Sequence, residues 1–452
     1  MDVPPTLVSF ATAVGPTSRV TSPEFKAVGS RVVLLQPKYT DALLPETESL
    51  KEVYAQVQKL IGEGKAKAVS TPGYGCLAES LFKMCVGNRI GLALENVEAE
   101  ELFRPAYGSF VLEVAEDVTV GRTIGHTTEA YALSLNGDAL DLADLQEIWE
   151  ARLEPVMPYR AKGEAVAPLR HNEPEARLRH APIAIAKPRV IIPVFPGTNC
   201  EYDTAQAFEK AGAEAQVLVI NNLTPAAVAE SCEALVKAIK NSQIVMLPGG
   251  FSGGDEPDGS AKFITAFFRA PAVTEAVHEL LKQRDGLMLG ICNGFQALVK
   301  LGLVPYGDIV PMTPECATLT FNNIGRHQSR LVRTRVASNL SPWLSRCQVG
   351  DIHNVAISHG EGRFVASQEL LAELKAKGQI ATQYVDEAGV PSMDLSVNPN
   401  GALLAIEGIT SPDGRVMGKM GHTERSANGL YVNVPGENFQ PLIEGGVGYF
   451  TE

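Results

Sequence analysis

The chain has 452 residues, more than one typical domain holds, and its 45% hydrophobic and 20% charged residues are ordinary for a globular protein with packed cores. Its net charge of −13 argues against a nucleic-acid-binding surface. The sequence contains no apolar run of about 18 residues, no secretory signal at its start and no Cys-x-x-Cys pair among its seven cysteines. The composition therefore predicts a cytoplasmic protein with no membrane association, no nucleic-acid partner, no disulfide framework and no bound metal.

The N-terminal part, residues 1–153, mixes strand and helix patterns and is predicted to be a smaller α/β or α+β unit. Its apolar and β-branched runs indicate strands, and a Gly-rich turn at 71–75 precedes a helical pattern. The predicted strands include 31–36, 110–114 and 130–135, and the predicted helices are 49–63, 77–86 and 141–152.

Residues 154–187 are rich in proline, alternate in charge and show no sustained apolar period. Such composition is typical of an extended connector between domains. We therefore expect the connector to separate the N-terminal part from a C-terminal domain at residues 188–452.

The C-terminal domain alternates strands with helices, which predicts a doubly wound, mostly parallel sheet. The predicted strands are 190–194, 215–220, 244–247 and 286–291, and helical patterns follow at 202–211, 226–239, 260–284 and 295–301. In such sheets ligands bind beyond the carboxyl ends of the strands. Two glycine-containing turns, PGGF at 248–251 and ICNG at 291–294, lie at such ends.

Cys292 lies in the turn Gly290-Ile-Cys-Asn-Gly294, between a predicted strand and a predicted helix. This Gly-x-nucleophile-x-Gly turn lifts a nucleophile above the sheet, and the N-terminus of the next helix favours the thiolate. We therefore predict that Cys292 is a nucleophile of acyl transfer. The backbone N–H of Asn293 would help to bind the oxyanion, and the Pro-Gly-Gly-Phe turn containing Gly249 and Gly250 could supply another donor.

A nucleophilic cysteine needs a histidine, and the histidine needs an orienting carboxylate. Two segments offer this pair at the same spacing, His359-Gly-Glu361 and His422-Thr-Glu424. In an extended backbone, residues two apart point to the same side, so either pair could place an imidazole beside a carboxylate. The spacing alone does not choose between them.

Four segments together resemble the class I glutaminase domain of phosphoribosylformylglycinamidine synthases: PGTNCEYD, LPGGFSGGDEPDG, LGICNGFQALVKLGLVP and MGKMGHTERS. The resemblance covers residues 188–452. In the N-terminal part, VPPTLVSFATAV, SPEFKAVGSRVVLL and LAESLFKM resemble the C-terminal subdomain of the synthetase portion of the same family, which is similar to aminoimidazole ribonucleotide synthetases.

The resemblance implies that His422 is the base and Glu424 its carboxylate, and it gives His359 and Glu361 no catalytic role. It also implies an oxyanion hole and a glutamine-binding site. The residues it implies for these are the backbones of Gly249, Gly250 and Asn293 for the oxyanion, with Gln296 and Phe251 for glutamine. Cys200 is expected to have a packing role.

The implied reaction is hydrolysis of glutamine to glutamate and ammonia, which serves ATP-dependent conversion of formylglycinamide ribonucleotide to the amidine in purine biosynthesis. The N-terminal part is far shorter than the family's synthetase portion, so ATP and Mg²⁺ are expected mainly outside this chain. The missing portion would be part of a longer chain or a separate subunit. Two alternatives remain: a glutaminase serving another synthetase, such as those that make GMP or CTP, and a non-catalytic scaffold that is inactive without its synthetase.

Overall fold

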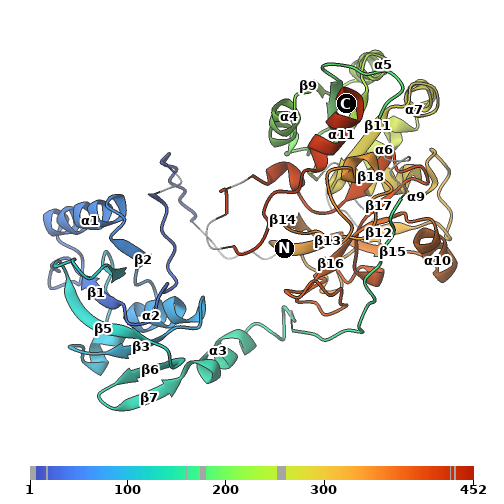
Figure 1. Ribbon diagram of the computed structural model, residues 1–452. Coiled ribbons are helices and arrows are strands. Elements are labelled where there is room, and N and C mark those ends of the chain that lie inside the picture. Colours follow the sequence, from blue (N-terminus) through green and yellow to red (C-terminus); the bar gives the residue numbers. More distant parts are fainter. Residues whose placement is uncertain are drawn as a thin grey trace. The chain divides into compact units, whose positions relative to one another are not determined.

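The computed structural model forms two compact units, Met1–Pro155 and Val156–Glu452 (Figure 1). The structure describes residues 7–16, 19–158, 160–173, 180–251, 261–427, 429–431 and 434–452. The second half of the motif LPGGFSGGDEPDG therefore lies outside the described residues.

The first unit is built on a seven-stranded sheet in the order β2-β4-β1-β5-β3-β6-β7, in which only the β3–β6 pair is parallel. The strands are β1 (Arg31–Leu35), β2 (Ala66–Ser70), β3 (Gly91–Leu94), β4 (Phe110–Val114), β5 (Arg122–Thr128), β6 (Ala132–Leu135) and β7 (Asp138–Asp141). The helices are α1 (Thr47–Gly62), α2 (Cys76–Val86) and α3 (Leu142–Ala151), with a 3-10 turn η2 (Ala99–Phe103).

Both faces of this first sheet are covered by a hydrophobic core. Successive side chains of a strand point to opposite faces. Val32 and Leu34 of β1 accordingly join the cluster that contains residues of α2, while Val33 joins the cluster that contains residues of α1. The predicted strands and helices of this unit are present, and β5 and β7 are additional strands.

The second unit contains a nine-stranded sheet in the order β14-β13-β16-β17-β18-β11-β10-β8-β9. Its strands are β8 (Arg189–Val194), β9 (Glu214–Val219), β10 (Ile244–Leu247), β11 (Leu287–Ile291), β13 (Gln328–Val336), β14 (Ile352–His359), β16 (Ile380–Val385), β17 (Ile406–Thr410) and β18 (Val416–Lys419). β12 (Thr318–Thr320) and β15 (Arg363–Val365) form a separate pair. Pairing from β9 to β18 is parallel, and pairing from β18 to β14 is antiparallel.

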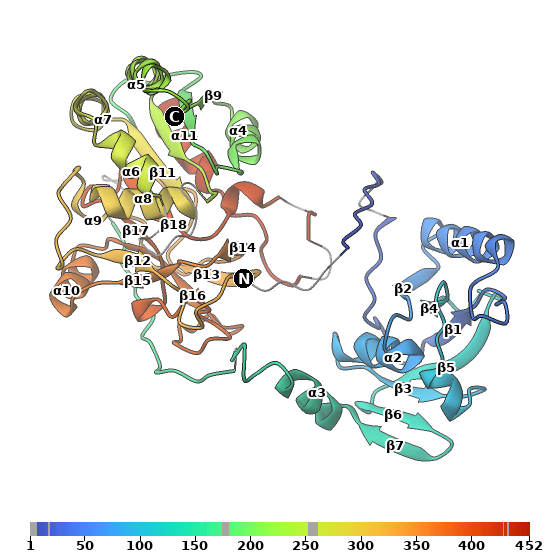
Figure 2. The same cartoon turned by 180° about the vertical axis from the view of Figure 1, so that it is seen from behind.

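Helices cover both faces of the parallel half (Figures 1 and 2). They are α4 (Glu201–Lys210), α5 (Pro225–Lys240), α6 (Lys262–Phe268), α7 (Pro271–Lys282), α8 (Asn293–Leu301) and α11 (Leu442–Thr451), while α9 (Leu303–Tyr306) and α10 (Gln368–Ala376) follow later in the chain. α5 and α7 pack side by side, and α4 contacts α11. Right-handed crossovers explain this, because the chain reverses its direction across the sheet between α4 and α5.

The α/β class predicted for the C-terminal domain is confirmed, and its helices and strands up to Leu301 occur within a few residues of the predicted bounds. The antiparallel half, β13 to β17, was not predicted from the sequence.

From Val156 on, the described part of the predicted connector, residues 154–187, belongs to the second unit and contacts it. Ala165 and His171 form isolated bridges with Ser392 and Ser338. Further along, the backbone N–H groups of Ala181 and Ile185 donate to carbonyl groups of α11. The proline-rich composition disfavours regular structure, and these hydrogen bonds attach the described parts of the segment to the domain.

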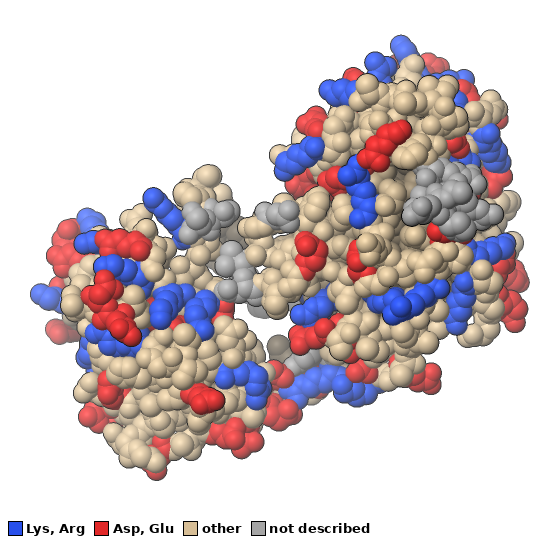
Figure 3. Space-filling view, in the orientation of Figure 1, with Lys and Arg blue, Asp and Glu red and all other residues tan. Residues whose placement is uncertain are grey.

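No helix in the described ranges is long and apolar enough to cross a membrane. On the face seen in Figure 3, acidic and basic side chains are interspersed over the described surface of each unit.

Candidate active site

Several loops meet at one edge of the nine-stranded sheet. β8, β10, β11 and β18 run parallel and end at nearly the same level, with Leu247 opposite Gly290 and Ile291 opposite Lys419. β14 runs in the same direction, because four antiparallel steps separate it from β18. The loops that follow these strands therefore begin at the same edge, where parallel sheets bind their ligands.

Cys292 lies at this edge between β11 and α8, with a backbone φ of 51° and ψ of −106°. Its N–H donates to the carbonyl of Lys419 at 2.9 Å. A Cβ on Gly290 would lie 2.6 Å from the carbonyl oxygen of Gly294, and a Cβ on Gly294 would overlap the carbonyl of Leu247. The turn therefore excludes side chains on both sides of the cysteine, as the sequence pattern predicts, and holds it in a left-handed conformation that is costly for a non-glycine residue.

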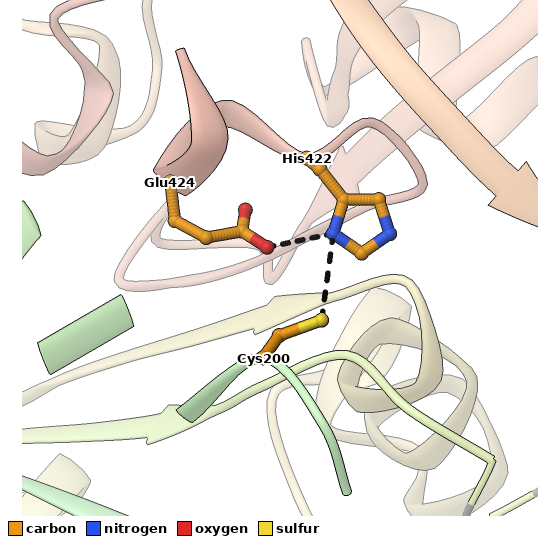
Figure 4. A group of neighbouring side chains, drawn as sticks. All are labelled: Cys200, His422 and Glu424. Carbon is orange, nitrogen blue, oxygen red and sulfur yellow. Dashed lines mark hydrogen bonds and ion pairs between the residues drawn. The ribbon is translucent and has the colours of Figure 1, made fainter. Parts of the chain in front are cut away.

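His422 follows β18 and lies at the start of the 3-10 turn η6 (Thr423–Arg425). Its Nδ1 atom is 2.6 Å from Oε1 of Glu424, and both side chains are buried (Figure 4). Its backbone N–H donates to the carbonyl of Ala356 at 2.8 Å, which ties this loop to β14. The carboxylate fixes the ring and leaves Nε2 as the nitrogen available for proton transfer.

The electrostatics of the thiol and the imidazole are coupled. Burial alone raises the pKa of Cys292, but hydrogen bonds with His359 and His422 and the charge of both imidazoles lower it to about 6. Burial lowers the pKa of His422, but the charge of Glu424 and hydrogen bonds with Cys200, Cys292 and Glu424 raise it well above its usual value. Near neutral pH the site therefore favours a thiolate beside an imidazolium.

Of the three residues whose backbones are predicted to bind an oxyanion, Asn293 and Gly249 lie close to Cys292. Asn293 begins α8, so its N–H has no partner within the helix. A Cβ on Gly249 would lie 2.7 Å from Cε1 of His422 and 3.5 Å from Cβ of Cys292, so this backbone touches both groups. Gly250 forms a bridge with Thr198 and has a φ of 152°.

The two side chains predicted to bind glutamine differ in their surroundings. Gln296 is buried in α8, where it accepts from Nδ2 of Asn293 at 2.9 Å and donates to the carbonyl of Glu361 at 2.6 Å. Its amide therefore joins the nucleophile helix to the turn after β14. Phe251 is 38% exposed and packs against His327, with 6.1 Å between ring centroids.

The structure brings the rival pair, His359 and Glu361, to the same site. His359 ends β14 and bonds through Nε2 to Oδ1 of Asn400 at 2.7 Å. Asn400 was missed by sequence reasoning, because it lies 41 residues beyond His359 and belongs to no motif. Only the folded topology brings these two residues together.

A buried ion pair beneath the His422 loop was also missed. Nζ of Lys419 is 3.7 Å from Oε1 of Glu407, and both side chains are fully buried. Lys419 also donates to Thr423 at 2.6 Å, and Glu407 accepts from the N–H of Gly421 at 2.7 Å. The pair therefore holds the residues on both sides of His422. A lysine in an otherwise apolar strand was the only signal in the sequence.

Cys200, which follows β8, faces the same imidazole. Its Sγ atom is 3.9 Å from Nδ1 of His422, on the side shown in Figure 4. The donor atoms of Cys200, His422 and Glu424 all lie within 4.8 Å of one another. These are ligand types that Zn²⁺ uses, so the group could hold a metal if the bond between His422 and Glu424 opened.

Comparison with known proteins gives a consistent result for the second unit. A family model for the CobB/CobQ-like glutamine amidotransferase domain matches residues 187–449. Phosphoribosylformylglycinamidine synthase subunit PurQ from Methanococcus maripaludis strain C7 is 35% identical over 248 residues, which are 53% of this chain and 82% of that protein.

The PurQ subunit from Dehalococcoides mccartyi is 34% identical over 246 residues, covering 54% of this chain and 88% of that protein. A solved chain described as the structure of PurLQS from Thermotoga maritima is 24% identical, with a TM-score of 0.41, and the match covers 58% of this chain and 99% of that chain. The family model and the two PurQ relatives confirm the resemblance of residues 188–452 to the glutaminase domain of phosphoribosylformylglycinamidine synthases.

Proposed function

The chain belongs to the CobB/CobQ-like glutamine amidotransferase family, and on that premise we propose that its second unit hydrolyses glutamine through Cys292, His422 and Glu424. The observation that carries the proposal is the geometry at the sheet edge. A thiol with a pKa of about 6 interacts with a buried imidazole, and that imidazole lies 2.6 Å from a buried carboxylate. This set supplies a nucleophile, a proton donor and an orienting group for acyl transfer.

In the proposed reaction the thiolate of Cys292 attacks the carboxamide carbon of glutamine, and the oxyanion forms beside the backbones of Gly249, Gly250 and Asn293. The C–N bond breaks while the His422 imidazolium donates its proton to the leaving nitrogen. This first stage of the reaction yields ammonia and a thioester between Cys292 and the glutamyl group. Water then attacks the thioester, His422 accepts a proton from the water, and glutamate leaves.

We propose that the ammonia serves conversion of formylglycinamide ribonucleotide to formylglycinamidine ribonucleotide, because the PurQ relatives are named as subunits of that synthase. In this proposal the partner is the synthetase, which binds the ribonucleotide and uses ATP and Mg²⁺. In this scheme the hydrolysis of glutamine needs no cofactor, since the thiol, the imidazole and the carboxylate account for every bond formed and every proton transferred.

The test is release of glutamate from glutamine by the chain alone and together with a PurL-type synthetase, ATP, Mg²⁺ and formylglycinamide ribonucleotide. We expect release to depend on both Cys292 and His422, so that Cys292→Ala and His422→Ala abolish it. Formation of the amidine would identify the acceptor. A mixture that releases no Cys292-dependent glutamate would show that the unit acts as a scaffold.

A further inference from the structure

The carboxylate of Glu424 uses only one of its two oxygens in the site described above. Oε1 lies 2.6 Å from Nδ1 of His422, whereas the second oxygen points away from Cys200 (Figure 4). This second oxygen, Oε2, is buried and forms a hydrogen bond with none of the described residues. Burying a carboxylate oxygen without a donor is costly, so we expect a donor beside Oε2.

Glu424 also lines a small cavity of about 120 Å³. The cavity lies between α4, α11 and the residues of η6 and the loop that follows it. Two further polar residues of its lining, Ser426 and Gln440, have buried side-chain atoms. A water molecule takes up about 30 Å³ in the liquid, so the cavity has room for at least one.

Two hydrogen bonds fix which way the amide of Gln440 points. Nζ of Lys419 and the hydroxyl of Thr423 each lie 2.8 Å from Oε1 of Gln440. An ammonium group can only donate, so the atom that faces Lys419 must be the amide oxygen. The amide nitrogen, Nε2, is therefore on the other branch. It is buried, and no residue within the described ranges accepts a hydrogen bond from it, although Gln440 is only 2% exposed.

The cavity thus combines a buried acceptor, Oε2 of Glu424, with a buried donor, Nε2 of Gln440, and these two atoms do not bond to each other. A water molecule can accept from an amide N–H and donate to a carboxylate at the same time. The hydroxyl of Ser426, which also interacts with Tyr431, can provide a third partner. A cation would be repelled by the amide N–H, and an anion by the carboxylate, so water fits this lining best.

We propose that Gln440 is a positioning residue, which holds a water molecule in this cavity so that the water donates to Oε2 of Glu424. The last torsion of a glutamate side chain has a broad minimum, so a carboxylate held at one oxygen can turn. A donor at the second oxygen fixes the plane of the carboxylate and keeps Oε1 on Nδ1 of His422. The inference rests on the proposed function, since it concerns the carboxylate that orients the imidazole of that reaction.

The proposal also gives the buried ion pair of Lys419 and Glu407 a part in the site. Nζ of Lys419 is 3.7 Å from Oε1 of Glu407 and donates both to Thr423 and to Gln440. These contacts hold the amide oxygen of Gln440 and thereby turn its N–H groups toward the cavity. A hydrogen-bonded path then leads from β17 and β18 through Gln440 and the water to Glu424.

The experiment observes the ring N–H of His422 by nuclear magnetic resonance in the full chain with ¹⁵N-labelled histidines. The signal is assigned by its loss in His422→Asn, and its shift and its exchange with solvent report the bond to Glu424 without glutamine turnover. Gln440→Met removes the amide. Ala207→Leu fills the cavity from α4 and leaves every side-chain hydrogen bond of the lining in place.

In both variants we expect the signal to shift and its exchange with solvent to become faster, because the carboxylate holds the ring less firmly. Where glutamate release is measured, kcat should fall roughly 10- to 100-fold, since the imidazole is no longer held in its reacting position. KM for glutamine should stay nearly unchanged, because Glu424 contacts the imidazole and not the substrate in the proposed reaction.

Gln379→Met is the matched control. Gln379 is also 2% exposed, and its Nε2 donates to the carbonyls of Pro305 and Thr410 at 2.8 and 2.9 Å. Losing these bonds should lower the unfolding free energy but leave the His422 signal and kcat unchanged. A shift in this control as large as in Gln440→Met would refute a specific role for Gln440.

The proposal requires a response in both variants. A response in only one of the two folded variants overturns it: Gln440 would then act only through Lys419 and Thr423, or the cavity would act without Gln440. An unchanged signal in both overturns it as well. If one variant does not fold, the other decides by the same criterion. Because the signal needs no glutamine, a chain that releases no glutamate still gives a clear answer.

Discussion

Replacing Gly249 with alanine tests whether the backbone after β10 must touch the catalytic groups. The added Cβ would lie 2.7 Å from Cε1 of His422, 3.0 Å from Sγ of Cys200 and 3.5 Å from Cβ of Cys292. Comfortable contact begins at 3.4 Å, so the imidazole has to move by about 0.7 Å or the backbone has to shift by a similar amount. Either movement separates His422 from the position in which it serves the thiol.

A misplacement of about 1 Å at a reacting group costs roughly 100-fold in rate. We therefore expect Gly249→Ala to lower kcat/KM for glutamate release by roughly 30- to 100-fold, whereas overpacking should cost about 1–3 kcal/mol of unfolding free energy. Initial rates against glutamine concentration and urea unfolding measure the two effects. Gly62→Ala is the matched control, because Gly62 ends α1 and has nothing within 4 Å of its added Cβ. A folded Gly249→Ala variant with the rate of the unaltered chain would refute this reasoning.

Glu424→Gln keeps the side-chain shape but removes the charge that, against the effect of burial, raises the pKa of His422. In pH–rate profiles we expect up to roughly 10⁴-fold slower glutamate release and an alkaline limb moved to lower pH, since less imidazolium remains to protonate ammonia. Lys419→Met should lower the unfolding free energy by about 3–5 kcal/mol, because Glu407 then stays buried without its cation. Adding Glu407→Gln should restore part of that loss in urea unfolding. Cys200→Ala should retain most of the glutamate release, and its complete loss would contradict the choice of nucleophile.

The parallel half of the second unit could be predicted from the sequence because its strands are short apolar runs separated by amphipathic helices. β10, for example, is four fully buried apolar residues. The strands of the antiparallel half lack a clear apolar pattern in the sequence. All six residues of β16 are buried, yet Thr382 and Gln383 in its centre are polar. Thr382 donates to Glu407, and Gln383 donates to the carbonyl of Leu404, so both are satisfied inside the fold. Such internal partners are invisible in a pattern of polar and apolar residues.

The turn around Cys292 was predictable because its signal is local: two glycines, a strand and a helix define it. The spacing of residues could not predict which histidine is the base, since His359 and His422 are each two residues from a glutamate. In the structure His422 bonds to Glu424, whereas Nε2 of His359 bonds to Asn400. These different partners depend on which strands end next to each other in the sheet. The spacing of residues along the sequence does not reveal that.

The antiparallel half of the sheet is what brings a second imidazole to the thiol. A purely parallel sheet ending at β18 would place the loops of Cys292, Gly249 and His422 at one edge, but it would leave the side of the thiol near Ser358 open. Four antiparallel steps return the chain in the direction of β11, and β14 then contributes His359 to the thiol and the Ala356 carbonyl to the His422 loop. One strand thus positions both imidazoles. A substitution that shifts β14 should therefore disturb the ionisation of the thiol and the position of the acid together.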